Sequence, residues 1–356
     1  MKSPYQGLSR DAFWRTGVSA KNIESLSNVY RPKTPVKKNE KVITLGSCFA
    51  QHIARNMRKR GYTVFDSEPP PKGLHGLAAN KFGYELFSAR TGNVYVMRQL
   101  LQLFEEAFGL WTPSSIVWEK SGRYFDAMRP SVEPDGHVSP EVVTKHRKNH
   151  LANVKTMFKT ADVFIFTLGL TEAWMHKDSG DIYPTAPGTI AGEFNNSQYV
   201  FKNFTFLEIY EDFMKLKVHL KRVNPKLRFI LSVSPVPLTA TATDQHVLTA
   251  TTYSKSVLRG VAGQLALEND DIDYFPSFDI LTSTLAAGKL YEKNLRSISP
   301  EGVGIAMNTF FNANEVGDGD IEVTSEGASV NSDYLNSSQD SDEEFCEDVL
   351  LEAFNK

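Results

Sequence analysis

Short apolar runs alternate along the chain with longer segments in which apolar residues recur every three or four positions. The longer segments, such as 206–223 and 247–268, predict amphipathic helices. The runs predict buried strands, which we expect at 42–45, 62–65, 163–168, 228–233 and 272–275. Strands that alternate with helices in this way predict one five-stranded parallel sheet covered on both faces.

Local signals predict where several elements begin and end. Gly61 is a typical stop for a helix over 50–60. Ser299 and Pro300 suit the N-cap and first turn of the last helix. Polar turn residues inside 116–126 and 173–183 predict two hairpins.

Composition divides the chain into three parts. Residues 1–40 predict an irregular N-terminal arm, 41–312 an α/β domain, and 313–356 an acidic disordered tail. The tail holds 13 acidic residues and one basic residue, so the rest of the chain carries +9 within a total of −3. The 38 basic residues of that remainder are scattered among 29 acids without a long basic block, which argues against a nucleic-acid partner.

The two cysteines, Cys48 and Cys346, form neither a disulfide framework nor a zinc cluster, and they suit a reducing cytoplasm. We see no N-terminal secretory run and no apolar stretch near the ~18 residues of a membrane span. No metal-ligand spacing and no glycine-rich phosphate loop occurs, so we expect no metal and no cofactor. The oligomeric state stays open.

The pentad Gly46-Ser47-Cys48-Phe49-Ala50 carries the main chemical signal. It joins the first strand to the first helix, at the sheet edge where open α/β proteins place their chemistry. The N–H groups of a helix N-terminus favour a thiolate or an oxyanion there. The same residues would equally serve as an ordinary strand-to-helix turn.

The chain resembles the GSCFA family over roughly residues 40–312. The resemblance rests on the pentad and on the segments Gly92–Leu101, Thr167–Trp174 and Ser232–Thr239. That family groups with the SGNH/GDSL-like hydrolases. The resemblance therefore implies a flavodoxin-like three-layer α/β/α sandwich and esterase or acyltransferase chemistry on acyl esters, with a small molecule, a glycan or a carrier thioester as substrate.

Proteins of the SGNH/GDSL-like superfamily carry their site residues in four short sequence blocks. Matching these blocks to this chain implies roles for several residues. Cys48 falls in the nucleophile position and Ser47 in the preceding acid position, although either could be the nucleophile. Oxyanion or substrate contacts are implied for Gly46, Gly92, Asn93, Gly169 and Thr171. Glu172 stands in the place of an acid in the third block, or else caps the following turn.

The last block departs from the superfamily. Where Asp-x-x-His is expected, the chain has Asn294-Leu295-Arg296-Ser297, so both the acid and the histidine are missing. A nucleophile then needs another base or a lowered pKa. We expect His246, oriented by Asp244, to be that base, with His75 as a weaker candidate and His52 as a structural residue. The alternative is a binding module without catalysis.

Overall fold

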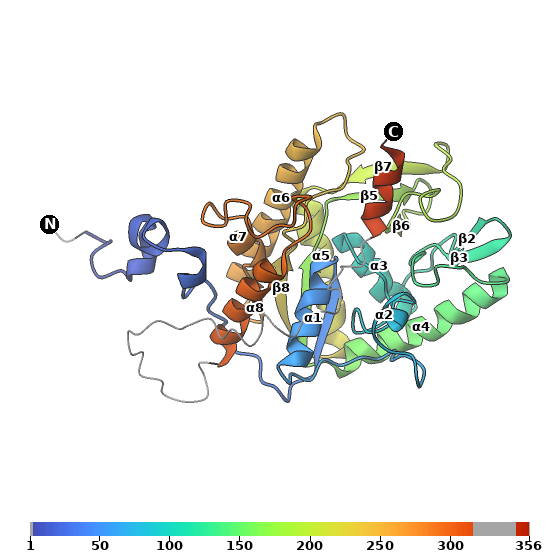
Figure 1. Ribbon diagram of the computed structural model, residues 1–356. Helices are drawn as coiled ribbons and strands as arrows, with labels where there is room; N and C mark the ends of the chain where they lie inside the picture. Colours follow the sequence, from blue (N-terminus) through green and yellow to red (C-terminus); the bar gives the residue numbers. More distant parts are fainter. Residues whose placement is uncertain (1–2, 316–346, 356) are drawn as a thin grey trace.

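The computed structural model describes residues 3–315 and 347–355. At its centre lies a parallel sheet of four strands in the order β1-β4-β8-β9 (Figure 1). These strands are β1 (Val42–Gly46), β4 (Val163–Leu168), β8 (Arg228–Val233) and β9 (Ile272–Phe275). The register pairs Gly46 with Thr167 and Leu168 with Val233, so neighbouring strands end at similar levels.

The prediction of a fifth strand at 62–65 was wrong. These residues form only an isolated parallel bridge between Val42 and Val64. Further along β1, a loop takes over the outer edge: Thr44 N–H donates to Ser88 Oγ at 3.0 Å, and Val94 N–H donates to the Gly46 carbonyl at 2.9 Å. The loop that replaces the strand therefore lies against the end of β1.

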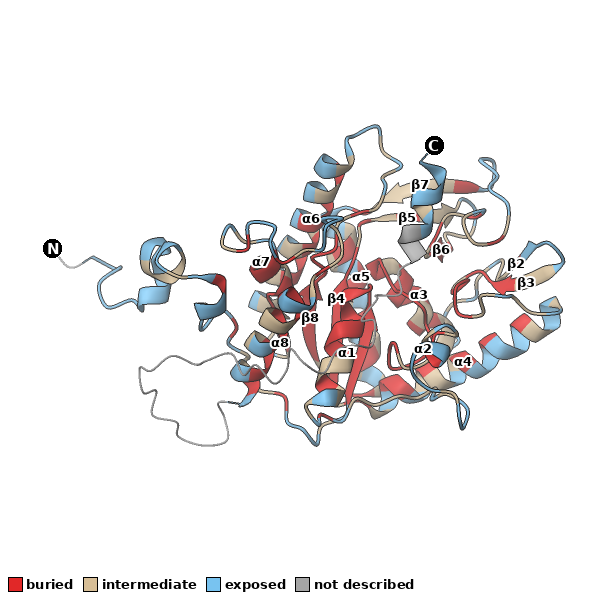
Figure 2. Ribbon diagram, in the orientation of Figure 1, coloured by how far each residue is buried: buried red, intermediate tan, exposed pale blue. Residues whose placement is uncertain are grey.

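Helices cover both faces of the sheet, as predicted, because alternate strand residues point to opposite sides. Phe164 and Phe166 belong to the core beneath α3 (Met97–Ala107), α4 (Pro140–Thr160), α5 (Phe206–Val223) and α6 (Val247–Glu268). Val163 and Ile165 belong to the core beneath α1 (Phe49–Lys59), α7 (Ser277–Leu281) and α8 (Pro300–Glu315). Figure 2 shows the buried residues concentrated on the sheet and the helix faces that cover it.

Both predicted hairpins are confirmed. One consists of β2 (Val117–Lys120) and β3 (Arg123–Asp126). The other, β5 (Glu172–His176) with β6 (Ile182–Tyr183), gains a third antiparallel strand that the sequence did not reveal, β7 (Tyr199–Asn203). The short helices α2 (Gly76–Asn80) and α7 were also not predicted.

The N-terminal region has two parts. The helical turns η1 (Arg10–Ala12) and η2 (Arg15–Ser19) project from the body, and η3 (Ile23–Ser25) leads toward it (Figure 1). Beyond η3, the Tyr30 ring contacts Phe275 and Phe310. The end of the expected arm therefore packs on the sheet domain.

The C-terminal boundary also differs in detail from the expected 312. Helix α8 continues to Glu315, and the buried side chain of Asn314 accepts the N–H of Val36 at 2.7 Å. Most of the predicted disordered tail, 316–346, lies outside the described residues. After it comes η5 (Glu347–Phe354).

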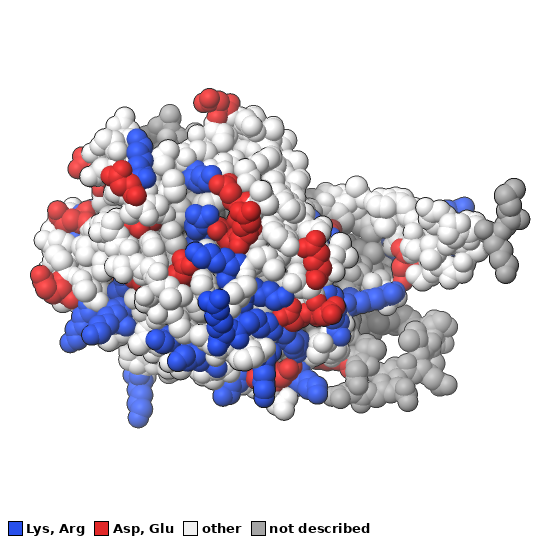
Figure 3. Space-filling model, turned by 180° about the vertical axis from the view of Figure 1, so that it is seen from behind, with Lys and Arg blue, Asp and Glu red and all other residues white. Residues whose placement is uncertain are grey.

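Surface charge is mixed. On the face shown in Figure 3, lysines and arginines gather in the lower half with acids among them. Several of the chain's bases are paired, such as Lys217 and Lys221 with Asp271, and Arg228 with Glu40.

Candidate functional site

The pentad forms a tight turn between β1 and α1. Gly46 has φ 138°, and a Cβ there would stand 2.4 Å from the Thr167 carbonyl oxygen, so this position accepts only glycine. Ser47 N–H donates to the same carbonyl at 3.1 Å. The turn is therefore fixed to β4 on one side and, through the bond from Val94, to the loop on the other.

Ser47, one of the two candidate nucleophiles, is buried in the turn. Its residue is only 3% exposed, and its hydroxyl has no hydrogen-bond partner among the described residues. The side chain lies against Gly169, where a Cβ would come within 2.8 Å of Ser47 Cβ. The first two loops of the expected site thus meet at Ser47 and Gly169.

Cys48 is placed differently. It is the N-cap residue of α1, it is buried, and it is disulfide-bonded. The sequence has one other cysteine, Cys346, which lies outside the described residues. The expectation of reduced cysteines is therefore not met at Cys48, whose sulfur is not a thiolate in this state.

Asn93 is carried to the turn by the loop that covers β1. Gln51, in the first turn of α1, donates from Nε2 to Asn93 Oδ1 at 3.4 Å. Gln99 holds the loop backbone, donating to the Asn93 carbonyl at 3.0 Å and accepting Tyr95 N–H at 2.9 Å. These bonds fix both the backbone and the amide oxygen of Asn93 beside α1. Gly92, before it, has φ 65° and shapes the loop.

The loop after β4 supplies a hydroxyl rather than the expected backbone donor. Gly169 N–H already donates to the Tyr95 carbonyl at 3.1 Å, so it is not an oxyanion donor in this arrangement. Thr171 Oγ1, in contrast, is fully buried without a partner among the described residues. Thr167 Oγ1 shares that property, so three unsatisfied hydroxyls lie at the ends of β1 and β4.

Sequence reasoning missed Lys255. This lysine of α6 is 2% exposed, and its Nζ donates to the Gly169 carbonyl at 2.7 Å. The preceding residue, Ser254, accepts Thr171 N–H at 3.1 Å. The signal was present in the sequence, since Lys255 falls on the stripe of α6 that also carries the buried Leu258 and Ala262.

Glu172 and His246 both make hydrogen bonds that do not involve Ser47. Thr241 Oγ1 donates to Glu172 Oε1 at 2.8 Å, and burial raises the pKa of this carboxyl above its ordinary value despite that bond. Glu172 thereby ties the loop after β4 to the loop after β8. His246 is the N-cap of α6, and its Nδ1 accepts Leu248 N–H at 3.2 Å.

The structure does not bring His246 to Ser47 by any described contact. Its ring is exposed, and it precedes Lys255 on α6 by about 13 Å along the helix axis. Asp244 is exposed as well. His75 is exposed beside Glu85, and His52 is buried in α1 against Phe49.

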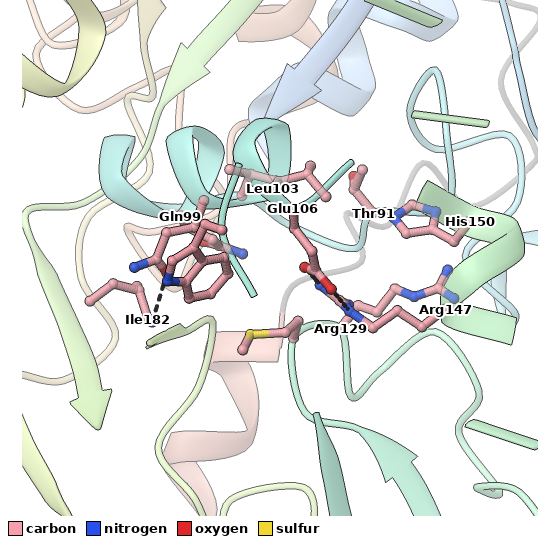
Figure 4. A pocket seen from close by; sticks show the side chains of 12 residues that line it. Thr91, Gln99, Leu103, Glu106, Arg129, Arg147, His150 and Ile182 are labelled. Carbon is pink, nitrogen blue, oxygen red and sulfur yellow. Dashed lines mark hydrogen bonds and ion pairs between the residues drawn. The ribbon is translucent and has the colours of Figure 1, made fainter. Parts of the chain in front are cut away.

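A second buried polar region lies between β3 and α4. Arg147 binds Asp126 at 2.9 Å and Glu106 at 2.7 Å, and Arg129 binds Asp126 at 2.8 Å. Although burial opposes it, the charges of Arg147 and Arg129 lower the pKa of Asp126 to about 2. Figure 4 shows Arg129, Arg147 and Glu106 around a cavity of about 20 Å³, enough for one water molecule.

His150 and Glu68 belong to the same region, joined at 2.7 Å. Burial and the charge of Arg129 lower the pKa of His150 to about 4. Burial raises the pKa of Glu68, but the bond from His150 and the charge of Arg129 bring it down to about 2. Because its charges are paired, this region is a structural network.

Within residues 3–315 and 347–355, no group of three His, Cys, Asp or Glu residues is placed to hold a metal ion. A helix both long and apolar enough to cross a membrane is likewise missing from this part of the chain.

These features define an α/β protein with a candidate nucleophile at the carboxyl end of its first strand. A sequence model of the GSCFA family matches residues 41–310. The chain therefore belongs to the GSCFA family. A comparison with curated proteins finds no match.

Proposed function

We propose that the protein hydrolyses or transfers an acyl group, with Ser47 as the nucleophile. The observation that carries this proposal is the buried hydroxyl of Ser47 at the end of β1, which has no partner among the described residues. Leaving such a group unsatisfied costs a folded protein ~1–3 kcal/mol, which favours a role in chemistry. The resemblance to SGNH-like hydrolases supplies the substrate class: an acyl ester of a small molecule or glycan, or a carrier thioester.

The surrounding groups suit the tetrahedral intermediate of acyl transfer. Ser47 Oγ attacks the acyl carbonyl carbon, and the negative charge forms on the carbonyl oxygen. The Thr171 hydroxyl is the donor assigned to that oxygen. Each such donor typically stabilises the transition state by ~3 kcal/mol. No metal and no cofactor enters this scheme.

The alternative is a binding module that kept the fold without the chemistry. Two observations favour it: the missing Asp-x-x-His block and the exposed, helix-capping position of His246. The role of His246 as base, oriented by Asp244, stays a prediction. It requires the imidazole ring to give up its hydrogen bond with the Leu248 N–H.

Labelling with a fluorophosphonate, which reacts with activated serines, separates the two functions. We expect the wild-type protein to gain one phosphonyl group, located on Ser47 by peptide mass spectrometry. Ser47→Ala should abolish labelling without loss of thermal stability, because it removes an unsatisfied hydroxyl.

The matched control is Ser277→Ala. Ser277 is also buried, but its hydroxyl bonds to Ser232 and to the Val233 carbonyl. This control should keep labelling and lose about 1 kcal/mol of stability. A folded wild-type protein that resists labelling would support the binding module.

A further inference from the structure

We propose that the loop between β6 and β7, with the aromatic residues of β5 and β7 beside it, is a binding surface for a neutral glycan. This inference does not depend on acyl chemistry, because a binding module would use the surface equally. Its centre is a hollow of about 430 Å³ that opens to the solvent. Ligand sites typically have roughly 300–1,000 Å³, so the hollow has room for a sugar unit.

The side chains around the hollow suit hydroxyl groups. The hollow is lined by Glu193, Phe194, Asn195, Asn196 and Gln198. A carboxamide has two N–H donors and an oxygen acceptor, and a carboxylate accepts only. No described hydrogen bond involves the side chains of Asn196 or Gln198, so their amides are available to a ligand. Sugar hydroxyls both donate and accept, and they match this combination of groups.

The charge and polarity of the lining select among ligands. Of the described residues that line the hollow, Glu193 alone is charged, so it repels phosphate, sulfate and carboxylate groups. Among the same described residues only Phe194 is apolar, which disfavours an acyl chain or another lipid. A neutral ligand rich in hydroxyls meets both conditions.

Phe194 supplies the surface on which a sugar ring can pack. This residue is 45% exposed, yet its ring is held edge-on against Trp174, with the ring centroids 5.1 Å apart. Trp174 contacts Phe201 in a similar way, with a centroid distance of 5.8 Å. The face of an aromatic ring is electronegative and attracts the polarised C–H groups on one face of a pyranose.

Hydrogen bonds fix the loop in the absence of a ligand. Asn195 Oδ1 accepts the N–H of Ser197 at 2.9 Å and its hydroxyl at 2.8 Å. The Asn195 carbonyl accepts the N–H of Gln198 at 3.0 Å, and Lys177 Nζ donates to the Asn196 carbonyl at 2.5 Å. Binding therefore costs little conformational entropy, because the loop is already ordered.

The surface is connected to the candidate site through β5. This strand begins at Glu172, directly after Thr171, and it reaches Trp174 two residues later. At about 3.3 Å per residue, the backbone of Trp174 lies about 10 Å from that of Thr171. Figure 1 shows β5, β6 and β7 on the side of the molecule away from the N-terminal turns. A glycan that extends along β5 toward its first residue thus approaches the candidate site.

Binding of defined oligosaccharides to the full-length protein tests the inference. The probes are neutral hexasaccharides of glucose, xylose, mannose and N-acetylglucosamine, measured by titration calorimetry and by saturation-transfer NMR. We expect at least one of them to bind, with the strongest transfer to the C–H protons of its sugar rings. Phe194→Ala should weaken this binding by ~10-fold or more, because the packing surface is lost.

The matched control is Phe206→Ala. Phe206 is 39% exposed and stacks on Tyr210 with a centroid distance of 6.3 Å, but it belongs to α5. This variant should bind the same hexasaccharide as tightly as the wild type. Asn196→Ala and Gln198→Ala should weaken binding, while their stability stays within about 0.5 kcal/mol of wild type, because both side chains are exposed.

A sulfated hexasaccharide separates sugar recognition from the attraction of an anion. We expect it to bind more weakly than the neutral chains, because its charge meets Glu193. Glu193→Gln should reduce that difference.

The outcomes separate this inference from the proposed function. If no neutral hexasaccharide binds, if Phe194→Ala binds as tightly as the wild type, or if the sulfated chain alone binds, the inference is wrong. Fluorophosphonate labelling of Ser47 needs no sugar, so these results leave the proposed function in place. Failure of the labelling would, conversely, leave the glycan surface in place.

Discussion

The GSCFA turn and the ion-pair network of α4 are both buried and polar, but they satisfy their polar atoms differently. In the network, the guanidinium of Arg147 meets two carboxylates, and His150 meets Glu68. At the turn, the hydroxyls of Ser47 and Thr171 have no described partner. Both regions are covered to a similar degree, so burial alone does not distinguish them.

The difference indicates what each region does. A charge buried with its partners holds elements together, and the network joins α3, α4 and the end of β3. A buried hydroxyl without a partner stabilises nothing, and its cost is acceptable where a substrate supplies the missing bond. Unsatisfied groups are therefore a better guide to the site than perturbed pKa values, several of which belong to the network.

The largest expected effect is on the network. Arg147→Met leaves Asp126 and Glu106 without their main partner, so we expect the free energy of unfolding to fall by ~3–5 kcal/mol. Urea denaturation measures this change. The exposed neighbour Lys148→Met should change stability by less than about 0.5 kcal/mol. Equal effects of the two substitutions would show that the network does not hold the fold together.

Acid should weaken the network next. Because the pKa of His150 falls from 6.5 in the unfolded chain to about 4, the unfolded state binds the extra proton between these values. Stability is thus full above pH 6.5 and declines as pH drops toward 4, by about 3 kcal/mol. Below pH 4.5, the lowered pKa of Glu68 extends the decline. His150→Gln should flatten the pH 4–6.5 part of the curve, and a slope unchanged by this variant would contradict the assignment.

The smallest effect on stability is expected at the turn. Thr171→Val removes an unsatisfied hydroxyl at nearly constant volume, so the free energy of unfolding should stay within about 1 kcal/mol of wild type or rise. Fluorophosphonate labelling should slow by ~10²-fold because an oxyanion donor is lost.

Thr205→Val is the control, since Thr205 Oγ1 accepts Glu208 N–H at the start of α5. It should cost about 1 kcal/mol and leave labelling unchanged. If Thr171→Val destabilised the protein more than this control, the contrast between the two regions would not hold.

The sequence predicted elements well wherever one periodic pattern dominated. The bounds of β4, β8, β9, α5 and α6 agree with the prediction. The strand predicted at 62–65 was wrong because these residues have the local pattern of a strand, whereas Ser88 and Val94 make the hydrogen bonds along the edge of β1. Which segment covers an edge depends on tertiary packing that periodicity does not contain.

The candidate site was predicted in part for similar reasons. Ser47, Gly169 and Asn93 follow from strand ends and motifs, and the structure places them around one turn. Lys255 was overlooked because a lysine inside a long helix is usually solvated, and its direction depends on how α6 meets the loop after β4. His246 was predicted as the base because it lies at the start of a helix. At that position, its ring caps the helix by accepting the N–H of Leu248.

The parallel pairing of β1 with β4 also bears on how the protein folds. The backbone of Lys41 binds Asp162, 121 positions further along the chain, just before the two strands begin to pair. Contacts of such long range form slowly, because the entropy of closing the loop is lost before the contact stabilises the chain. The turn around Ser47 is held by β4 and by the loop at 88–94, so a nascent chain that ends before residue 163 carries the pentad without the site.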